Sequence, residues 1–530
     1  MNRSLSVTSN SRNRLPSLAD IIFLGILFFL TLSGDERLLG DADTGYHIRA
    51  GEFILNNFRI PQTDIFSHVT PPLAWTLHEW LSEVVMAIIH RQAGMTGVVI
   101  FYSFMIALYI HLVFSWLLQE RSNTLFVSAM TLLVALSSSS NWLARPHIFT
   151  FVLFVTWYHL LNNYQYRDRN YLFLMPPIMV LWVNLHGGFI LGLILLGIYF
   201  GGNFAKAIFA SPNERAHGLM KTRFLGFIMA LCVSAALLNP YGYESLLFPF
   251  RVVQDKYLMD HIAEYLSPNF HFSTIVPFEI LLLTTIAVFA LSGAKLDTIE
   301  LALTVLFGHM ALYSTRHIPL FAILVGPIAL KQADIIFNKL PGRLIAAVRQ
   351  RLDNLTQIDR STTRYLWPVL GTLTLSILAY TGTISHDFNA KYVPVEAVKF
   401  LQKEPVKGNM FNNDEFGDYI IYTAWPQYRV FIDGRTDMYG ASGVKEYVKM
   451  TQAQDGWESL MDKYQITWVL HEPKAPLSKK LLERKDWQLI YADDIANIFV
   501  RVLPEYDALI NKYRGTKPTN PPTTERSYTN

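Results

Sequence analysis

Long apolar stretches alternate with short polar connections through the first 384 residues of the chain. A helix needs about 20 mostly apolar residues to cross the hydrocarbon core of a bilayer. Eleven stretches approach that length, at residues 18–34, 95–118, 124–141, 148–163, 171–185, 187–204, 223–239, 276–293, 298–314, 317–333 and 365–384. The pattern predicts a polytopic α-helical membrane protein with about eleven transmembrane helices in residues 1–384.

The connections between these stretches differ in charge. Arg3, Arg12 and Arg14 precede the first stretch, and Lys and Arg recur in every second connection, most densely at 331–364. Because cytoplasmic connections are enriched in Lys and Arg, the N-terminus is expected in the cytoplasm. No small-residue cleavage site follows the first stretch, so it is expected to stay in the membrane. An odd number of spans then places the C-terminal region outside, in the periplasm if this is a bacterial inner membrane.

Two connections on the external side are long. Residues 35–94 make up the first external loop, in which 42–58 and 76–92 have the pattern of helices. We expect both helices to lie in the membrane interface. Residues 240–275 make up the second external loop.

The chain changes character near residue 385. Short apolar strands alternate with helical segments up to residue 510, which predicts a small extracytoplasmic α/β domain at 385–510. The expected strands lie at 429–432, 466–470, 488–491 and 495–502. Residues 511–530, which end in a Pro- and Thr-rich segment, are expected to be disordered.

Composition supports the membrane class and removes others. Charged residues make up 16 % of the chain, against about 25 % in soluble proteins. The formal charge is only +3, from 45 basic and 42 acidic residues, so a nucleic acid is not an expected partner. The single cysteine, Cys232, lies in an apolar stretch and is expected to be a buried hydrophobic residue.

Polar side chains gather on the external face, contributed by six separate parts of the chain. Ionisable groups at a membrane edge are expensive and therefore point to function. Equivalent positions on the cytoplasmic face hold mainly Lys and Arg. The predicted substrate-binding residues are His47, His78, Glu79, Arg145, His147, Asn184, His186, Asn239, Tyr241, Glu264, Arg316 and His317.

Asp41 and Asp43 begin the first external loop and are the predicted catalytic residues. One of them is expected to act as a general base that deprotonates an acceptor hydroxyl. The alternative is that the pair only caps the following helix, because Asp is favoured at helix starts. Capping needs one Asp rather than two, and Asp43 is the candidate cap.

Arg145 and Arg316 lie at external turns and suit a phosphate or pyrophosphate group, which a guanidinium binds through two hydrogen bonds. Snorkelling of both side chains to the interface is the alternative. The histidines show no metal-ligand spacing, so no metal residue is assigned, although a divalent metal is left open as a cofactor. In the C-terminal region, Asp433-Gly434-Arg435 is expected to form a turn, with a ligand role as the alternative.

Taken together, the Asp-rich first loop, its two interfacial helices, the eleven spans and the external C-terminal domain resemble the GT-C superfamily of integral-membrane glycosyltransferases. That superfamily includes the protein O-mannosyltransferases and the lipid A aminoarabinose transferases. Residues 40–47 (GDADTGYH), 60–67 (IPQTDIFS) and 431–435 (FIDGR) also look like those of a group of poorly characterised bacterial membrane proteins placed near it.

The resemblance implies a sugar donor carried on a polyprenyl phosphate, a protein, lipid or glycan acceptor, inversion at the anomeric carbon and a first-loop Asp as base. Asp41 and Asp43 match that base, and Arg145 and Arg316 match the donor-phosphate site. The Asp-x-Asp motif departs from the adjacent Asp-Glu of the O-mannosyltransferases, so neither donor nor acceptor carries over. Two other classes remain open, a transporter or flippase for a lipid-linked sugar and a non-catalytic scaffold for envelope assembly.

Overall fold

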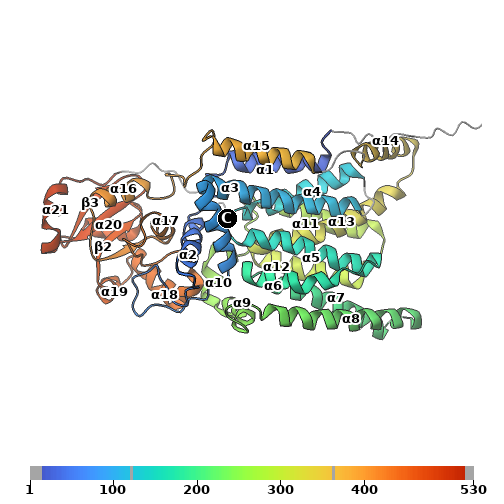
Figure 1. Ribbon diagram of the computed structural model, residues 1–530, viewed down its shortest axis with the longest axis horizontal. Coiled ribbons are helices and arrows are strands. Elements are labelled where there is room, and N and C mark those ends of the chain that lie inside the picture. The colour runs from blue at the N-terminus through green and yellow to red at the C-terminus, as the bar shows by residue number, and fades with distance from the viewer. Residues whose placement is uncertain (1–14, 120–122, 210, 361–364, 520–530) are drawn as a thin grey trace, which may run out of the picture.

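The computed structural model describes residues 15–119, 123–209, 211–360 and 365–519. Arg3, Arg12 and Arg14, on which the predicted orientation depends, lie outside these ranges, as do residues 520–530 of the expected disordered tail. The described chain has two parts, a bundle of long helices and a smaller mixed domain at one end of it (Figure 1).

Each of the eleven apolar stretches forms a helix of the bundle. In chain order they are α1 (Leu18–Leu32), α3 (Trp80–Gln119), α4 (Thr124–Ser138), α5 (His147–Arg167), α6 (Met175–Leu185), α7 (Phe189–Phe209), α8 (Pro212–Ala236), α11 (Val276–Ser292), α12 (Thr298–Tyr313), α13 (Ile318–Lys339) and α15 (Leu366–Tyr380). Amphipathic α14 (Arg343–Arg360) lies at the end of the bundle opposite the mixed domain (Figure 1).

Five helical segments among the described residues are long and apolar enough to cross a membrane. They are Trp80–Gln119, Thr124–Asn141, Phe189–Phe209, Arg215–Ala236 and Thr315–Lys339. Five other apolar helical segments have only 10–17 residues, short of the ~20 that a full span needs. The structure therefore identifies a membrane protein without supporting the full count of eleven spans.

The two helices expected at 76–92 and 95–118 are joined in one element. α3 runs from Trp80 to Gln119 and bends at Gly94, whose φ of 62° is left-handed. Glycine adopts this conformation without a steric penalty, so the two helices meet at a kink there. The bend separates a first-loop part of α3 from its membrane part.

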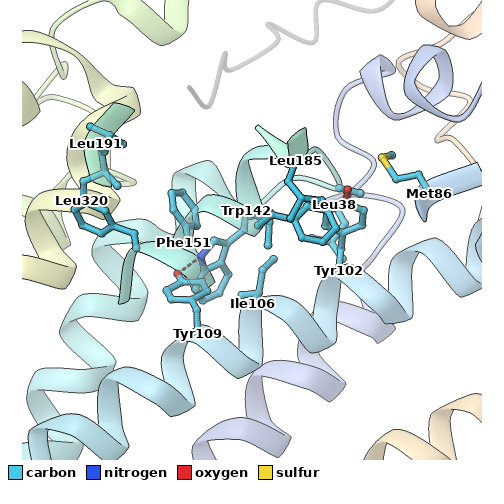
Figure 2. Packing of buried hydrophobic residues seen from close by; sticks show 14 of the residues in the cluster. Leu38, Met86, Tyr102, Ile106, Tyr109, Trp142, Phe151, Leu185, Leu191 and Leu320 are labelled. Atoms are coloured by element: carbon cyan, nitrogen blue, oxygen red, sulfur yellow. Dashed lines mark hydrogen bonds between the residues drawn. The ribbon is translucent and has the colours of Figure 1, made fainter. Parts of the chain in front are cut away.

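Buried aromatic residues fix the segment that leads into α5. The Trp142 indole Nε1–H donates to the Tyr109 hydroxyl at 2.6 Å (Figure 2). That hydroxyl also lies 2.7 Å from Ser138 Oγ. Trp142 is 8 % exposed and Tyr109 is fully buried. Because buried polar groups need hydrogen-bond partners, these contacts hold the Trp142 segment in one position on α3. Arg145 follows three residues later.

The C-terminal domain is built on a four-stranded sheet in the order β1-β2-β4-β3. β1 (Asn409–Asn412) pairs parallel to β2 (Ile466–His471), whereas β3 (Trp487–Ala492) and β2 both pair antiparallel to β4 (Asn497–Arg501). The domain's helices are α16 (Val395–Lys403), α17 (Asp414–Ala424), α18 (Thr436–Thr451), α19 (Trp457–Lys463), α20 (Pro476–Leu482) and α21 (Asp507–Tyr513).

Two expectations for this domain need correction. Residues 429–432 are not a strand of the sheet, because Val430 instead forms a bridge to Ser67 in the first external loop. The segment expected to be disordered from residue 511 begins inside α21, which continues to Tyr513.

A buried arginine joins the C-terminal domain to the first external loop. Arg435 Nη2 lies 2.6 Å from Asp433 Oδ2 and 2.9 Å from Asp64 Oδ1. Its guanidinium carbon lies 4.4 Å from the centre of the Trp75 ring and 5.0 Å from that of Phe66. Arg435 is 2 % exposed. We call Arg435, Asp433, Asp64, Phe66 and Trp75 the Arg435 latch. The turn expected at 433–435 therefore packs the C-terminal domain against the first-loop segment.

Candidate active site

The site lies where the bundle meets the C-terminal domain, beside α2 (Asp43–Asn57), which crosses this junction (Figure 1). Arg145 is at its centre. Its Nε donates to Asp41 Oδ1 at 3.1 Å, Nη2 lies 3.1 Å from Asp43 Oδ2, and Nη1 donates to Glu264 Oε1 at 2.8 Å. We call Asp41, Asp43, Arg145, Glu264 and Arg316 the acidic cluster.

Local structure leaves the Asp43 side chain available to the site. The N-cap residue of α2 is Ala42, which makes no side-chain capping bond. Asp41 Oδ1 accepts the backbone N–H of Asp43 at 3.2 Å. Asp41 therefore tightens the turn that begins the helix, and Asp43 is not used as its cap.

Arg316 approaches the cluster from the other side of Glu264. Its Nη1 lies 3.8 Å from Glu264 Oε2 and donates to the Tyr265 hydroxyl at 3.2 Å. The backbone carbonyl of Glu264 accepts from Ser314 Oγ and from Thr315 Oγ1 at 2.9 and 3.0 Å. Both arginines therefore contact the same carboxylate, that of Glu264.

The two arginines differ in how fully they are paired. All three nitrogens of Arg145 contact carboxylates, and its side chain is 19 % exposed. Arg316 has one long ion pair, and its side chain is 38 % exposed. An incoming phosphate would have to displace carboxylates at Arg145, whereas Arg316 can accept it directly.

The pKa values of Glu264 and Asp43, two carboxyl groups of the acidic cluster, are shifted in opposite directions. Burial alone would raise the pKa of Glu264, but the charges of Arg145 and Arg316 lower it to about 2. Burial raises the pKa of Asp43 to about 7, against the charge of Arg145 and with repulsion from Asp41. A carboxyl group with a pKa near neutral is suited to general base chemistry.

A second group of side chains surrounds Glu79. Glu79 Oε1 lies 3.3 Å from His186 Nε2 and 3.5 Å from His78 Nε2, and Glu79 Oε2 lies 3.9 Å from His47 Nδ1. His47 Nδ1 also lies 3.1 Å from Glu83 Oε1. We call these five residues the Glu79 cluster.

The histidines of this cluster differ in protonation. Burial lowers the pKa values of His47 and His186 to about 3. Burial opposes the charged form of His78 too, but Glu79 outweighs it and the pKa of His78 is raised. The Gly188 N–H donates to His186 Nδ1 at 2.9 Å, so the ring proton is assigned to Nε2, facing Glu79. The cluster is thus an ionised Glu79 beside His78, its most basic imidazole.

Neither cluster provides a metal centre. Among the described residues, no group of three or more His, Cys, Asp or Glu side chains is placed to hold a metal ion. Asp41, Asp43 and Glu264 converge, but they converge on the Arg145 guanidinium. The donor set therefore does not fit a divalent metal.

Three predicted binding residues hold neighbouring segments together instead. Asn184 accepts from Trp80 Nε1 at 2.8 Å and donates to the Leu238 carbonyl at 2.9 Å. Asn239 closes its own turn through the Tyr241 N–H at 2.8 Å, and the Tyr241 hydroxyl accepts from the Leu77 N–H at 2.8 Å. These hydrogen bonds hold the connecting segments in place. None of them reaches a residue of the acidic cluster.

The remaining two predicted residues lie at the edge of the site. His147 Nε2 is 2.7 Å from the Asn141 carbonyl, and its ring centre is 6.5 Å from that of His186. His317 is half-buried and follows Arg316 in a short 3₁₀ turn.

Sequence reasoning missed the contribution of the C-terminal domain. Asp418 of α17 is 1 % exposed, and its carboxyl group lies against Gly434, as that of Asp43 does. The available signal was an acidic residue between Phe416 and Ile420, on the apolar face of a short amphipathic helix. A charge in that position requires a buried partner.

Comparison with known proteins adds the fold. No protein-family model matches the chain, and no curated protein matches it by sequence. The structure of an oligosaccharyltransferase from Archaeoglobus fulgidus, in its apo form, superposes with a TM-score of 0.54. The alignment covers 92 % of this chain and 74 % of that one, at 12 % identity. The chain therefore shares the overall fold of that structure. At this identity the likeness extends to architecture alone.

Proposed function

We propose that the protein is an integral-membrane glycosyltransferase. It transfers a sugar from a polyprenyl-phosphate donor to a protein, lipid or glycan acceptor on the extracytoplasmic face. The observation that carries this proposal is Asp43, a carboxylate of raised pKa held beside Arg145 at the external end of a GT-C-type bundle. Such a group is what direct displacement at a sugar carbon needs on the acceptor side.

The proposed reaction is a single displacement. Asp43, or Asp41 beside it, takes the proton of the acceptor hydroxyl as that oxygen attacks the anomeric carbon. The bond from this carbon to the donor phosphate oxygen breaks, and its electron pair stays on the phosphate. Attack opposite the leaving group inverts the anomeric centre.

The two arginines have separate tasks in this proposal. Arg316 contacts the donor phosphate and offsets the charge that develops on it. Arg145 holds Asp41, Asp43 and Glu264 in place, which revises the phosphate-binding role predicted for it. The Glu79 cluster forms part of the surface against which the sugar or acceptor lies.

The proposed topology has eleven spans, a cytoplasmic N-terminus and an external C-terminal domain, in a bacterial inner membrane. A reporter that is active only in the periplasm, fused after residue 390, should be active in cells. Activity of a cytoplasmic reporter at that position would contradict both the topology and the placement of the site.

The function is tested by supplying membranes that contain the protein with labelled polyprenyl-phosphate sugars. Transfer of label to an acceptor is expected in wild type and absent in an Asp41→Asn/Asp43→Asn double variant. A structure solved with added polyprenyl phosphate should show the phosphate against Arg316. Movement of the intact donor across the membrane without transfer would instead support a flippase.

A further inference from the structure

The carboxyl groups of Asp43 and Asp418 meet across the junction between the bundle and the C-terminal domain. Asp43 begins α2, and Asp418 lies in α17, which packs along α2. Both carboxyl groups lie against the same residue, Gly434, which places them next to each other. Asp418 is 1 % exposed, and the Asp43 side chain is 16 % exposed.

The backbone around Gly434 keeps this pair together. The Gly434 N–H lies 3.1 Å from each oxygen of Asp418. A Cβ atom at residue 434 would overlap the Asp43 carboxylate. The chain therefore approaches both acids as closely as a residue without a side chain allows, and the Arg435 latch follows directly.

Two neighbouring carboxyl groups that are largely shielded from water favour a state in which one of them keeps its proton. Two adjacent negative charges in a medium of low dielectric repel strongly, and a proton on one acid can be donated to the other. Such a pair titrates as a unit, with apparent pKa values that belong to the pair.

We propose that Asp43 and Asp418 share one proton, and that Asp418 is thereby a positioning residue for the base. The inference rests on the proposed function. In the resting site the pair carries one proton and one negative charge. When the acceptor oxygen attacks, its proton passes to Asp43, and the negative charge moves to the departing phosphate.

The charges around the pair agree with this arrangement. Burial comes first among the effects that raise the pKa values of both Asp43 and Asp418, and each is further raised by neighbouring acids. The charged groups that face the pair are Asp41, Arg145 and Glu264 on the Asp43 side, and Asp414 and Asp433 on the Asp418 side.

Neither acid on the Asp418 side is free to replace it. Asp433 is held by Arg435 and accepts from the Tyr439 hydroxyl at 2.8 Å. Asp414 accepts from the Tyr447 hydroxyl at 3.0 Å. Asp418 is therefore the acid of the C-terminal domain that meets the proposed base.

The test is infrared difference spectroscopy of the purified full-length protein, and it requires no substrate. A shared proton gives a protonated-carboxyl C=O band that persists at about pH 8, above the pKa of about 7 to which Asp43 is raised, where a carboxyl group without a partner is ionised. The band should be lost in Asp418→Asn, because the amide donates to Asp43 without a titrating proton. In Asp43→Asn it should be lost or change frequency. Asp414→Asn, on the same helix, should leave it unchanged.

An unchanged band in either Asp418→Asn or Asp43→Asn would overturn the proposal, as would the absence of such a band in wild type. Asn at either position keeps the shape and a hydrogen-bonding group, and the unfolding temperature identifies a variant that has failed to fold. For such a variant, Asp418→Glu, which keeps the carboxyl group, should retain the band. The infrared band does not depend on turnover. A shared proton can therefore be found even if no sugar transfer is observed, and sugar transfer can be found even if the proton is not shared.

Discussion

The two ends of the helix bundle differ in how their acidic and basic side chains are paired. At the end away from the C-terminal domain, Lys206 Nζ pairs with Asp297 Oδ2 at 2.5 Å, and Lys331 Nζ pairs with Glu300 Oε1 at 2.8 Å. Each of these two lysines has its own carboxylate. Lys206 and Lys331 remain partly exposed, which is the usual arrangement for charged side chains at a membrane edge.

At the end that meets the C-terminal domain, carboxylates outnumber the cations that contact them. Asp41, Asp43 and Glu264 all contact Arg145, and Asp418 adds a fourth acid from another domain. Burying this excess of negative charge opposes folding. The contrast teaches that the two ends of the bundle balance charge differently, and four experiments can break or sharpen this comparison.

The largest effect is expected at the proposed base. Asp43→Asn should reduce transfer by about 10²–10⁴-fold, with Asp41→Asn the parallel variant. Asn preserves hydrogen bonding and is itself a good residue at a helix start, so folding should be retained. The measurement is the initial rate of transfer in membranes supplied with donor.

Asp297→Asn is the matched control at the opposite end. Asp297 caps α12 and pairs with Lys206. The substitution therefore removes a charged carboxylate from an ion pair, as Asp43→Asn does, at a position away from the candidate site. Wild-type rates in both Asp41→Asn and Asp43→Asn, each folded and inserted, would show that the pair is structural. The transporter and scaffold alternatives would then move ahead.

The next largest effect is expected at the Arg435 latch. Arg435→Ala leaves Asp64 and Asp433 buried without their cation, which should cost about 3–5 kcal/mol. The measurement is the unfolding temperature in detergent together with protease cleavage between residues 380 and 395. Lys399→Ala, which removes an exposed pair with Glu396, is the control. Equal stability of both variants would mean that the latch does not hold the domain.

A smaller effect is expected at Arg316. Loss of a charge-assisted hydrogen bond costs about 1.5–3 kcal/mol, so Arg316→Ala should weaken donor binding by roughly 10- to 100-fold. The KM for the donor should rise more than kcat falls. Lys331→Ala, at the other end of α13, should leave both constants unchanged. A wild-type KM in Arg316→Ala would remove the proposed phosphate site.

The smallest effect is expected from the paired charges at the opposite end. Lys206→Ala removes a partly exposed ion pair, which contributes about 0–1 kcal/mol. Transfer rates should stay at the wild-type value, and the unfolding temperature should change little. A large loss of transfer in this variant would mean that the two ends are not functionally distinct.

Sequence reasoning reached the helices and most of the acidic cluster because both depend on local pattern. Apolar length predicted each helix of the bundle, and alternation of external turns brought Asp41, Arg145, Glu264 and Arg316 to one face. Sequence reasoning did not reach Asp418, whose role appears only when α17 packs on α2. It also misplaced residues 429–432, because an apolar run does not reveal whether its partner is a sheet or a distant loop.

The order of residues along the chain gives the Arg435 latch a consequence for biogenesis. Asp418 and Arg435 follow every helix of the bundle, so the ribosome makes them after the membrane part. A chain whose helices have been inserted but whose C-terminal domain has not yet folded has Asp43 without its partner acid. The site is thus completed last, and activity reports that synthesis, insertion and external folding have all been finished.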